Sequence, residues 1–247
     1  MVYKLLFSPT GGTAAVANAL TDGQIVDLTD RSRDFSAVAL TAEDVAVIAV
    51  PSYAGRVPKT AAARLAEVQG GGARAVLVCV YGNRAYEDTL VELADLAEAA
   101  GFRAAAGIAA LAEHSIARTY AAGRPDAADK AELHTFWEKI EAKLRAGDDT
   151  APALPGNRPY KPLAVHSMVP HTAKRCIDCG RCAAACPVGA IDATDPRRTD
   201  ADLCIGCMRC VALCPVQARQ IDPDALAALT ARLAPLCAGH KENELFL

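Results

Sequence analysis

The stretch CIDCGRCAAACP at residues 176–187 returns in closely similar form as CIGCMRCVALCP at residues 204–215. Both copies follow the pattern C-x2-C-x2-C-x3-C-P. Thiolates are soft ligands that suit iron in a tetrahedral sulfur environment, and three closely spaced cysteines can surround one face of a cubane cluster from a tight loop. The repeat therefore predicts two [4Fe-4S] clusters, and it decides the fold of residues 171–222.

The ligands of the two clusters are expected to cross between the copies, because in two-cluster proteins the fourth cysteine of each run binds the other cluster. The first cluster is then held by Cys176, Cys179, Cys182 and Cys214. The second cluster is held by Cys204, Cys207, Cys210 and Cys186. A pair of structural zinc sites is the alternative, although zinc sites rarely need a crossed repeat.

With both motifs complete, residues 171–222 resemble the bacterial two-[4Fe-4S] ferredoxins. The resemblance implies a small α+β domain that relays single electrons through two closely placed clusters of low potential. Arg181 and Arg209 occupy the same position in the two copies. They could raise the cluster potentials or dock an acidic partner, and solvated surface charge is an equal alternative.

Upstream of the cysteines, residues 1–146 alternate strand and helix patterns. Apolar runs that predict strands lie at 2–7, 24–28, 44–50, 73–81 and 102–111. Helical patterns lie at 13–20, 59–68, 85–100 and 129–147. Continuous apolar runs such as DVAVIAV at 44–50 are typical of strands buried on both faces. The repeated strand–helix units therefore predict an α/β domain with a five-stranded parallel sheet covered by helices.

Three loops follow predicted strands and should meet at the carboxyl edge of this sheet, where α/β domains bind ligands. They are FSPTGGTAAVA at 7–17, PSYAGRVP at 51–58 and YGNRAYED at 81–88. The first loop offers hydroxyls, glycines and a helix N-terminus, which suit a phosphate, with a plain helix cap as the alternative. It matches neither the Walker pattern nor G-x-G-x-x-G. Since the other two loops carry aromatic residues, the set predicts a site for a phosphorylated planar ring.

At these loops the region resembles the flavodoxins, whose phosphate loop is similar to SPTGGT. The resemblance implies a doubly wound sheet that binds FMN, with the phosphate held by Ser8, Thr10, Gly11, Gly12 and Thr13. The ring would be flanked on one side by Pro51, Ser52, Tyr53, Ala54 and Gly55, and on the other by Gly82, Asn83, Arg84 and Tyr86. Tyr86 is expected to stack on the flavin ring, and the alternative is that its side chain only packs at the start of a helix. Arg56 and Arg84 depart from acidic flavodoxin loops and would stabilise an anionic reduced flavin.

The whole chain looks like the flavodoxin–ferredoxin fusion proteins of anaerobic bacteria and archaea. AEHSIA at 112–117 and GRPDA at 123–127 are also similar to those fusions. His114 would then lie near the flavin as a proton donor, or serve as a structural histidine. The resemblance implies an oxidoreductase-type electron carrier that converts between two-electron and one-electron couples for a partner redox enzyme. The alternative is an FMN-dependent reductase of a small substrate such as a quinone, fed through the clusters.

Composition and charge limit the class of partner and the cellular location that the sequence favours. The net charge of −3 comes with no basic block, which disfavours a nucleic-acid partner. No apolar run reaches the length of a membrane span, and the apolar stretch at the N-terminus is too short for a signal peptide. We therefore expect a cytoplasmic protein that binds a redox partner, with a homodimer as a possible assembly. Residues 147–170 hold five prolines and predict an extended linker, and residues 223–247 predict a helical tail.

Overall fold

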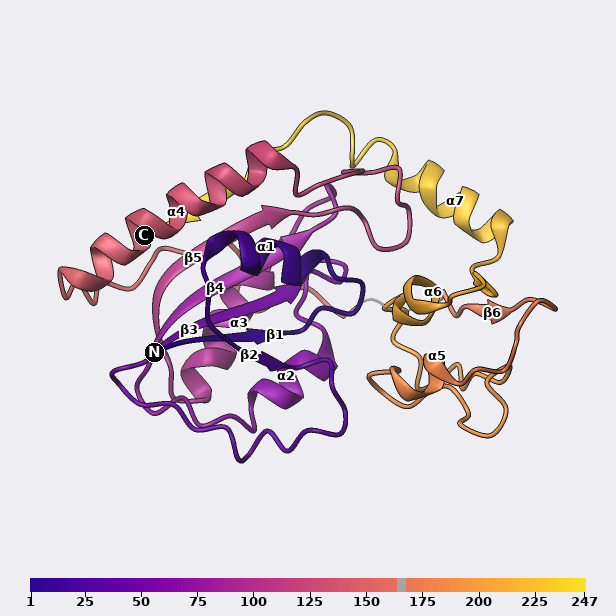
Figure 1. The fold of residues 1–247 in the computed structure, drawn as a ribbon. Helices are drawn as coiled ribbons and strands as arrows, with labels where there is room; N and C mark the ends of the chain where they lie inside the picture. Colours follow the sequence, from indigo (N-terminus) through magenta and orange to yellow (C-terminus); the bar gives the residue numbers. More distant parts are fainter. Residues whose placement is uncertain (164–167) are drawn as a thin grey trace.

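Five parallel strands form the centre of the N-terminal domain in the computed structural model, which describes residues 1–163 and 168–247. They are β1 (Val2–Leu6), β2 (Gln24–Asp27), β3 (Val45–Pro51), β4 (Arg74–Tyr81) and β5 (Arg103–Leu111). Their order across the sheet is β2-β1-β3-β4-β5, which is the order of the flavodoxin-like doubly wound fold (Figure 1). The predicted fold class of this domain is therefore confirmed.

Helices cover both faces of the sheet (Figure 1). One face packs against α1 (Gly12–Leu20) and α4 (Ala127–Arg145), and the other against α2 (Lys59–Leu65) and α3 (Thr89–Ala99). The apolar face predicted for the last helix is buried as expected, and consists of Leu133, Phe136, Trp137, Ile140 and Leu144. The core of the domain is thus built from the apolar runs that the sequence pattern identified.

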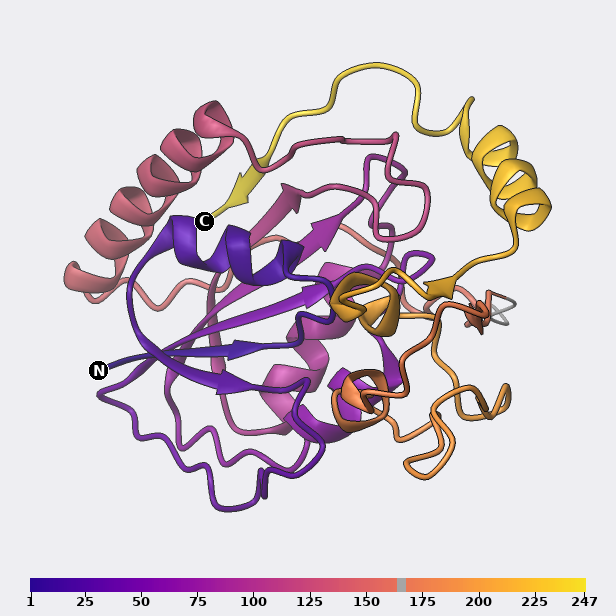
Figure 2. The same ribbon diagram turned by 45° about the vertical axis from the view of Figure 1, so that its right-hand side comes forward.

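The C-terminal tail differs from the predicted helix over residues 223–247. Helix α7 (Pro223–Leu233) ends early, and the chain then runs back to the N-terminal domain (Figure 2). There β8 (Glu244–Phe246) pairs antiparallel with β5 and becomes the sixth strand of the sheet. A three-residue strand has too short a pattern to be identified from sequence, and its pairing depends on the exposed edge of β5.

The proline-rich segment at 147–170 packs on its neighbours over the part that is described, while residues 164–167 lie outside the described residues. The buried carboxylate of Asp88 accepts hydrogen bonds from the backbone amides of Asn157 and Lys161, at 2.9 and 2.7 Å. Arg158 and Tyr160 both contact Asp95 on α3. Residues 157–161 are therefore held along the start of α3 rather than free in solvent.

The cysteine-rich domain lies beyond the carboxyl ends of the parallel strands (Figure 1). Its ends are joined by β6 (His171–Thr172) and β7 (Arg219–Gln220), which pair antiparallel, and its helices are the short α5 (Arg181–Ala184) and α6 (Arg209–Leu213). Its apolar core is small and consists of Ala183, Cys186, Ala190 and Ile191. In the described parts of the chain, no helix combines the length and the apolar character that crossing a membrane requires.

Candidate functional site

The eight motif cysteines line two separate cavities in the cysteine-rich domain. The first cavity is lined by Cys176, Cys179, Cys182 and Cys214. The second cavity is lined by Cys186, Cys204, Cys207 and Cys210. Each cavity thus takes three cysteines from one motif and the fourth from the other, which is the grouping that the sequence predicted for the two clusters.

The cysteine loops repeat the same unusual backbone at equivalent positions. Asp178 and Gly180 have positive φ angles of 51° and 70°, and their counterparts Gly206 and Met208 have angles of 60° and 62°. Left-handed residues of this kind curve the backbone so that its amides can face an anionic group. A Cβ added at Gly180 would meet nothing within 4 Å, so space is open beside the first cavity. The loops therefore suit a bulky anionic cluster.

All ten cysteines belong to the described residues, and none of them forms a disulfide. Within the described chain, no three His, Cys, Asp or Glu side chains converge closely enough to share one metal ion. The four cysteines of each set instead surround a cavity, as the corners of a cubane cluster require. The donor sets therefore fit two iron–sulfur clusters.

Burial changes the acidity of the cluster thiols. It raises the pKa of Cys207 to about 12 and that of Cys210 to about 11. Burial also acts on Cys214, but amide hydrogen bonds from Arg219, Ala218 and Val216 outweigh it and lower the pKa. Because iron binds thiolates, we expect cluster insertion to release protons from the buried pair.

The predicted phosphate loop lies between β1 and α1. The Ser8 hydroxyl accepts a hydrogen bond from the Ala14 amide in the first turn of α1 at 2.9 Å, and the N-cap position itself is held by Gly11, which has no side chain to cap the helix. Thr10 and Gly11 are exposed, whereas Thr13 is buried. Gly11 has a φ of 96°, and a Cβ added there would meet nothing within 4 Å. Gly12 lies close to the Ala112 side chain. Space is thus open beside Gly11 at the N-terminus of α1, where the amides before Ala14 have no partner inside the helix.

The second loop is a tight hairpin at the end of β3. Tyr53 and Arg56 exchange backbone hydrogen bonds of 3.0 and 3.2 Å, and Ala54 and Gly55 form the tip with positive φ angles. The Ser52 hydroxyl lies 2.8 Å from that of Thr89. Pro51 ends the strand. Part of the Tyr53 side chain is exposed. Burial of its hydroxyl raises the pKa well above its ordinary value, and the charge of Cys207 adds a smaller contribution in the same direction.

The third loop is bound by the C-terminal tail, which sequence reasoning did not connect with it. The Asn83 side chain donates to the carbonyls of Cys237 and Gly239, at 2.7 and 3.1 Å. The Tyr86 hydroxyl donates to Glu244 at 2.9 Å, and its ring packs edge-on against Tyr81. These side chains therefore already have protein partners, and the stacking role of Tyr86 stays a prediction.

Arg56 and Arg84, which the sequence predicted to stabilise an anionic reduced flavin, each pair with a carboxylate of the protein, and their effect on a flavin stays a prediction. Arg56 forms two hydrogen bonds of 2.8 Å with Glu92, and Arg84 pairs with Glu87 at 2.6 Å. The carboxylates neutralise both guanidinium groups. Only the three-dimensional structure shows the pair of Arg56 and Glu92, because Glu92 lies on α3 and reaches back to the loop after β3.

His114 lies against Gly82 of the third loop, where an added Cβ would come within 2.7 Å of the His114 Cα and Cβ. Its Nδ1 accepts hydrogen bonds from the amides of Ile116 and Ala117, at 3.2 and 3.1 Å. Burial, with the charge of Arg84, lowers the pKa of the imidazole. This is the arrangement expected of a structural histidine, and proton donation stays a prediction.

The comparisons with known proteins fall on both halves of the chain. Residues 175–218 match the family model of the 4Fe-4S dicluster domain. No curated protein matches the sequence. Among solved structures, the chain is similar to a flavodoxin from Streptococcus pneumonia TIGR4, with 19% sequence identity and a TM-score of 0.41. That similarity covers 58% of this chain and 99% of the other.

Proposed function

We propose that this chain, in which a flavodoxin-like domain is fused to a ferredoxin-type domain, carries electrons between an FMN and two [4Fe-4S] clusters for a partner redox enzyme. The observation that supports this most is the pair of cavities, each lined by four cysteines drawn from both motifs. The cysteine-rich domain lies at the edge of the sheet where the three predicted FMN loops meet (Figure 1). The two kinds of site are therefore neighbours in one polypeptide, which favours exchange between them.

The residues of the N-terminal domain fit an FMN at its phosphate end. The exposed Thr10, the open Gly11 and the first amides of α1 would hold the phosphate, and the helix dipole would favour its negative charge. Tyr53 and the backbone of Gly82 and Asn83 would orient the ring. When bound, FMN supplies a centre that accepts two electrons and can release them singly.

The alternative, a reductase of a small substrate such as a quinone, needs an open approach to the flavin and a proton donor. The tail contacts at Asn83 and Tyr86 cover one side of the third loop, and His114 already uses Nδ1 for backbone amides. These contacts support the carrier more than the reductase. The proposal extends to a cytoplasmic protein of anaerobic metabolism, which rests on the resemblance to the fusion proteins.

The test is anaerobic purification of the full chain, with cofactor counting and a redox titration. We expect one FMN and about eight irons per chain. Zinc in place of iron would contradict the cluster assignment, and a preparation that binds no flavin would contradict the FMN site.

A matched pair of threonine variants tests the phosphate loop. Thr10→Ala should raise the dissociation constant of FMN on the order of tenfold, because it removes a hydroxyl hydrogen bond to a charged group. Thr135→Ala, on the exposed side of α4, should leave it unchanged. Equal FMN affinity of both variants in a fluorescence titration would show that the loop does not bind the phosphate.

A further inference from the structure

The internal repeat puts two arginines at equivalent positions, yet their surroundings differ. Arg181 is exposed, whereas Arg209 is partly buried and its Nη1 donates to the Pro9 carbonyl at 3.1 Å. Pro9 belongs to the predicted phosphate loop. Figures 1 and 2 both show α6, which begins at Arg209, beside the loop that follows β1. Only the arginine of the second motif therefore reaches the N-terminal domain.

The Nε of Arg209 is buried and has no hydrogen-bond partner among the described atoms. A buried N–H group without a partner is costly, so the Nε of Arg209 is free to donate to a bound group; the Nε of Arg219 is unpaired in the same way. Arg209 lines the second cavity and touches the phosphate loop at the same time. A guanidinium between two anionic groups would serve both, because it is always charged and has several donors in one plane.

The second cavity is also the one packed against the N-terminal domain. Arg64 donates to the carbonyl of Leu28 in its own domain and to that of Pro187 in the cysteine-rich domain, both at 2.6 Å. Ile205, which lines the second cavity, packs on the core of the sheet. Ligands of the second cavity therefore lie next to the predicted flavin loops.

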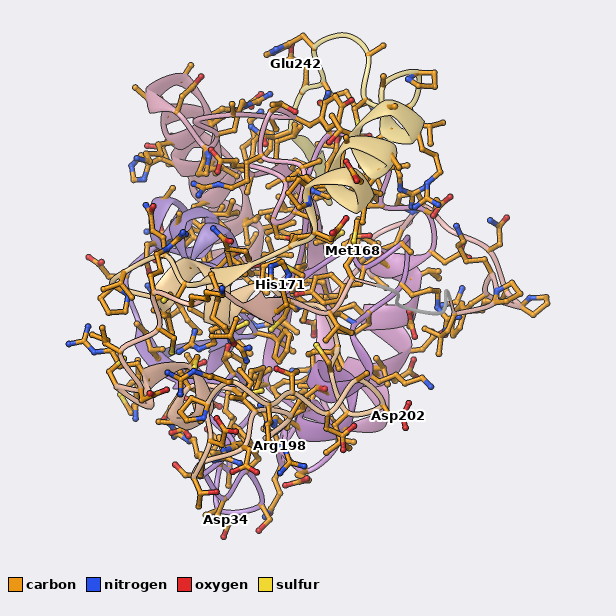
Figure 3. The ribbon with its side chains drawn as sticks, turned by 90° about the vertical axis from the view of Figure 1, so that its right-hand side faces the viewer. Asp34, Met168, His171, Arg198, Asp202 and Glu242 are labelled. Atoms are coloured by element: carbon orange, nitrogen blue, oxygen red, sulfur yellow. The ribbon has the colours of Figure 1, made fainter. Side chains whose placement is uncertain are left out.

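The first cavity lies on the outer side of the cysteine-rich domain. Cys179 is exposed, and the apolar side chains of Ile177 and Leu213 are 61% and 41% exposed. Figure 3 looks at the molecule from the side of this domain, on which Arg198 and Asp202 are labelled. The cysteines of the first set are thus more exposed than those of the second, in which Cys186 and Cys207 are buried, and this favours a redox partner at the first set.

We propose that the second cluster is the direct electron partner of the flavin, and that Arg209 is a positioning residue that joins the phosphate site to this cluster. This inference rests on the proposed function and adds the order flavin, second cluster, first cluster, external partner. Every step moves one electron. An FMN reduced beforehand by an external donor would be oxidised by one electron as the cluster held by Cys186, Cys204, Cys207 and Cys210 is reduced. That cluster would in turn be reoxidised by the cluster held by Cys176, Cys179, Cys182 and Cys214, which would reduce an external one-electron acceptor.

The repeat supplies a matched control for the test of Arg209. In the full chain, Arg209→Gln should raise the dissociation constant of FMN on the order of tenfold, because a charge-assisted hydrogen bond is lost. Arg209→Lys should restore part of the affinity, and Arg181→Gln should leave it unchanged. An effect of Arg181→Gln as large as that of Arg209→Gln, or wild-type affinity of Arg209→Gln, would overturn the role of Arg209. A wild-type protein without FMN affinity would instead contradict the proposed function.

The order of the clusters has an independent test in cysteine variants checked by iron counting. Cys179→Ala removes a ligand of the first cluster, and Cys207→Ala removes a ligand of the second. After photoreduction of the flavin, the remaining cluster of Cys179→Ala should be reduced at nearly the wild-type rate. In Cys207→Ala the rate should fall by at least an order of magnitude, because the electron must cross a longer gap. The reverse pattern would place the first cluster next to the flavin.

Discussion

At the scale of single residues, His114 shows how burial sets the behaviour of an ionisable group. Its Nδ1 accepts two backbone hydrogen bonds, which it can do only without a proton. Burial lowers its pKa below the unfolded value of about 6.5. The unfolded chain therefore binds more protons as the pH falls below that value, so the contribution of His114 to stability is present above it and is lost on acidification.

His114→Asn keeps an acceptor but cannot titrate, so we expect its free energy of unfolding to fall less than that of the wild type between about pH 7.5 and about pH 5. His114→Ala should cost about 1–3 kcal/mol at neutral pH, because it leaves two amides unpaired. Urea unfolding measures both, with His134→Asn on the exposed face of α4 as the control. A wild-type pH profile for His114→Asn would refute the role of the imidazole.

A second residue-scale prediction concerns Glu92, whose carboxylate binds the Arg56 guanidinium and the Val57 amide. The side chains of the pair are only 12% and 10% exposed. Removal of one partner from such a pair leaves a buried charge, so Glu92→Gln should lower the free energy of unfolding by about 3–5 kcal/mol.

The control for that loss is Glu141→Gln, which breaks the exposed pair with Arg145 on α4 and should cost less than about 1 kcal/mol. Urea unfolding of both variants gives the comparison. Similar losses of unfolding free energy in the two variants would mean that the buried pair of Arg56 and Glu92 stabilises the protein no more than an exposed pair.

At the scale of elements, the three-residue strand β8 is expected to stabilise the N-terminal domain more than its short length suggests. Its residues Leu245 and Phe246 are half-buried against the two faces of the sheet, and the strand covers the edge of β5. Deletion of residues 244–247 should destabilise the N-terminal domain by about 2–3 kcal/mol, from lost apolar burial. Deletion of Leu247 alone, which is exposed, should cost little.

Thermal unfolding measures this difference, and amide hydrogen exchange locates it. Exchange should rise at Gly107 and Ala109 of β5, which face β8, when the strand is removed. If exchange at these amides does not change, the sixth strand does not protect the sheet in solution.

At the scale of the whole molecule, the two domains should differ in their need for iron. The N-terminal domain has two large apolar cores, whereas the cysteine-rich domain has a core of four small or medium side chains. If the proposed clusters are bound, we expect them to supply most of the folding free energy of residues 171–222. Removal of iron should open this segment to proteases while residues 1–146 stay protected, and reconstitution with iron and sulfide should reverse the change. Equal resistance with and without iron would contradict this.

Much of the fold and part of the site follow from local sequence. The apolar runs of 44–50 and 73–81 identify buried strands, because a strand between two helical layers must be apolar on both faces. The spacing of Cys176, Cys179 and Cys182 brings three thiols together whatever surrounds them. The crossing of Cys186 and Cys214 follows only because the motif occurs twice.

The sequence by itself determined the strand–helix alternation, the two cysteine sets and the places of the three loops, since each is a short-range pattern. The tertiary structure alone decided that the second cavity faces the loop after β1, that Glu92 pairs with Arg56 and that Glu244 reaches Tyr86. These contacts join residues far apart in the chain. No periodicity or spacing encodes them, because they depend on how the whole domains pack and on which sheet edge is left for the tail to cover.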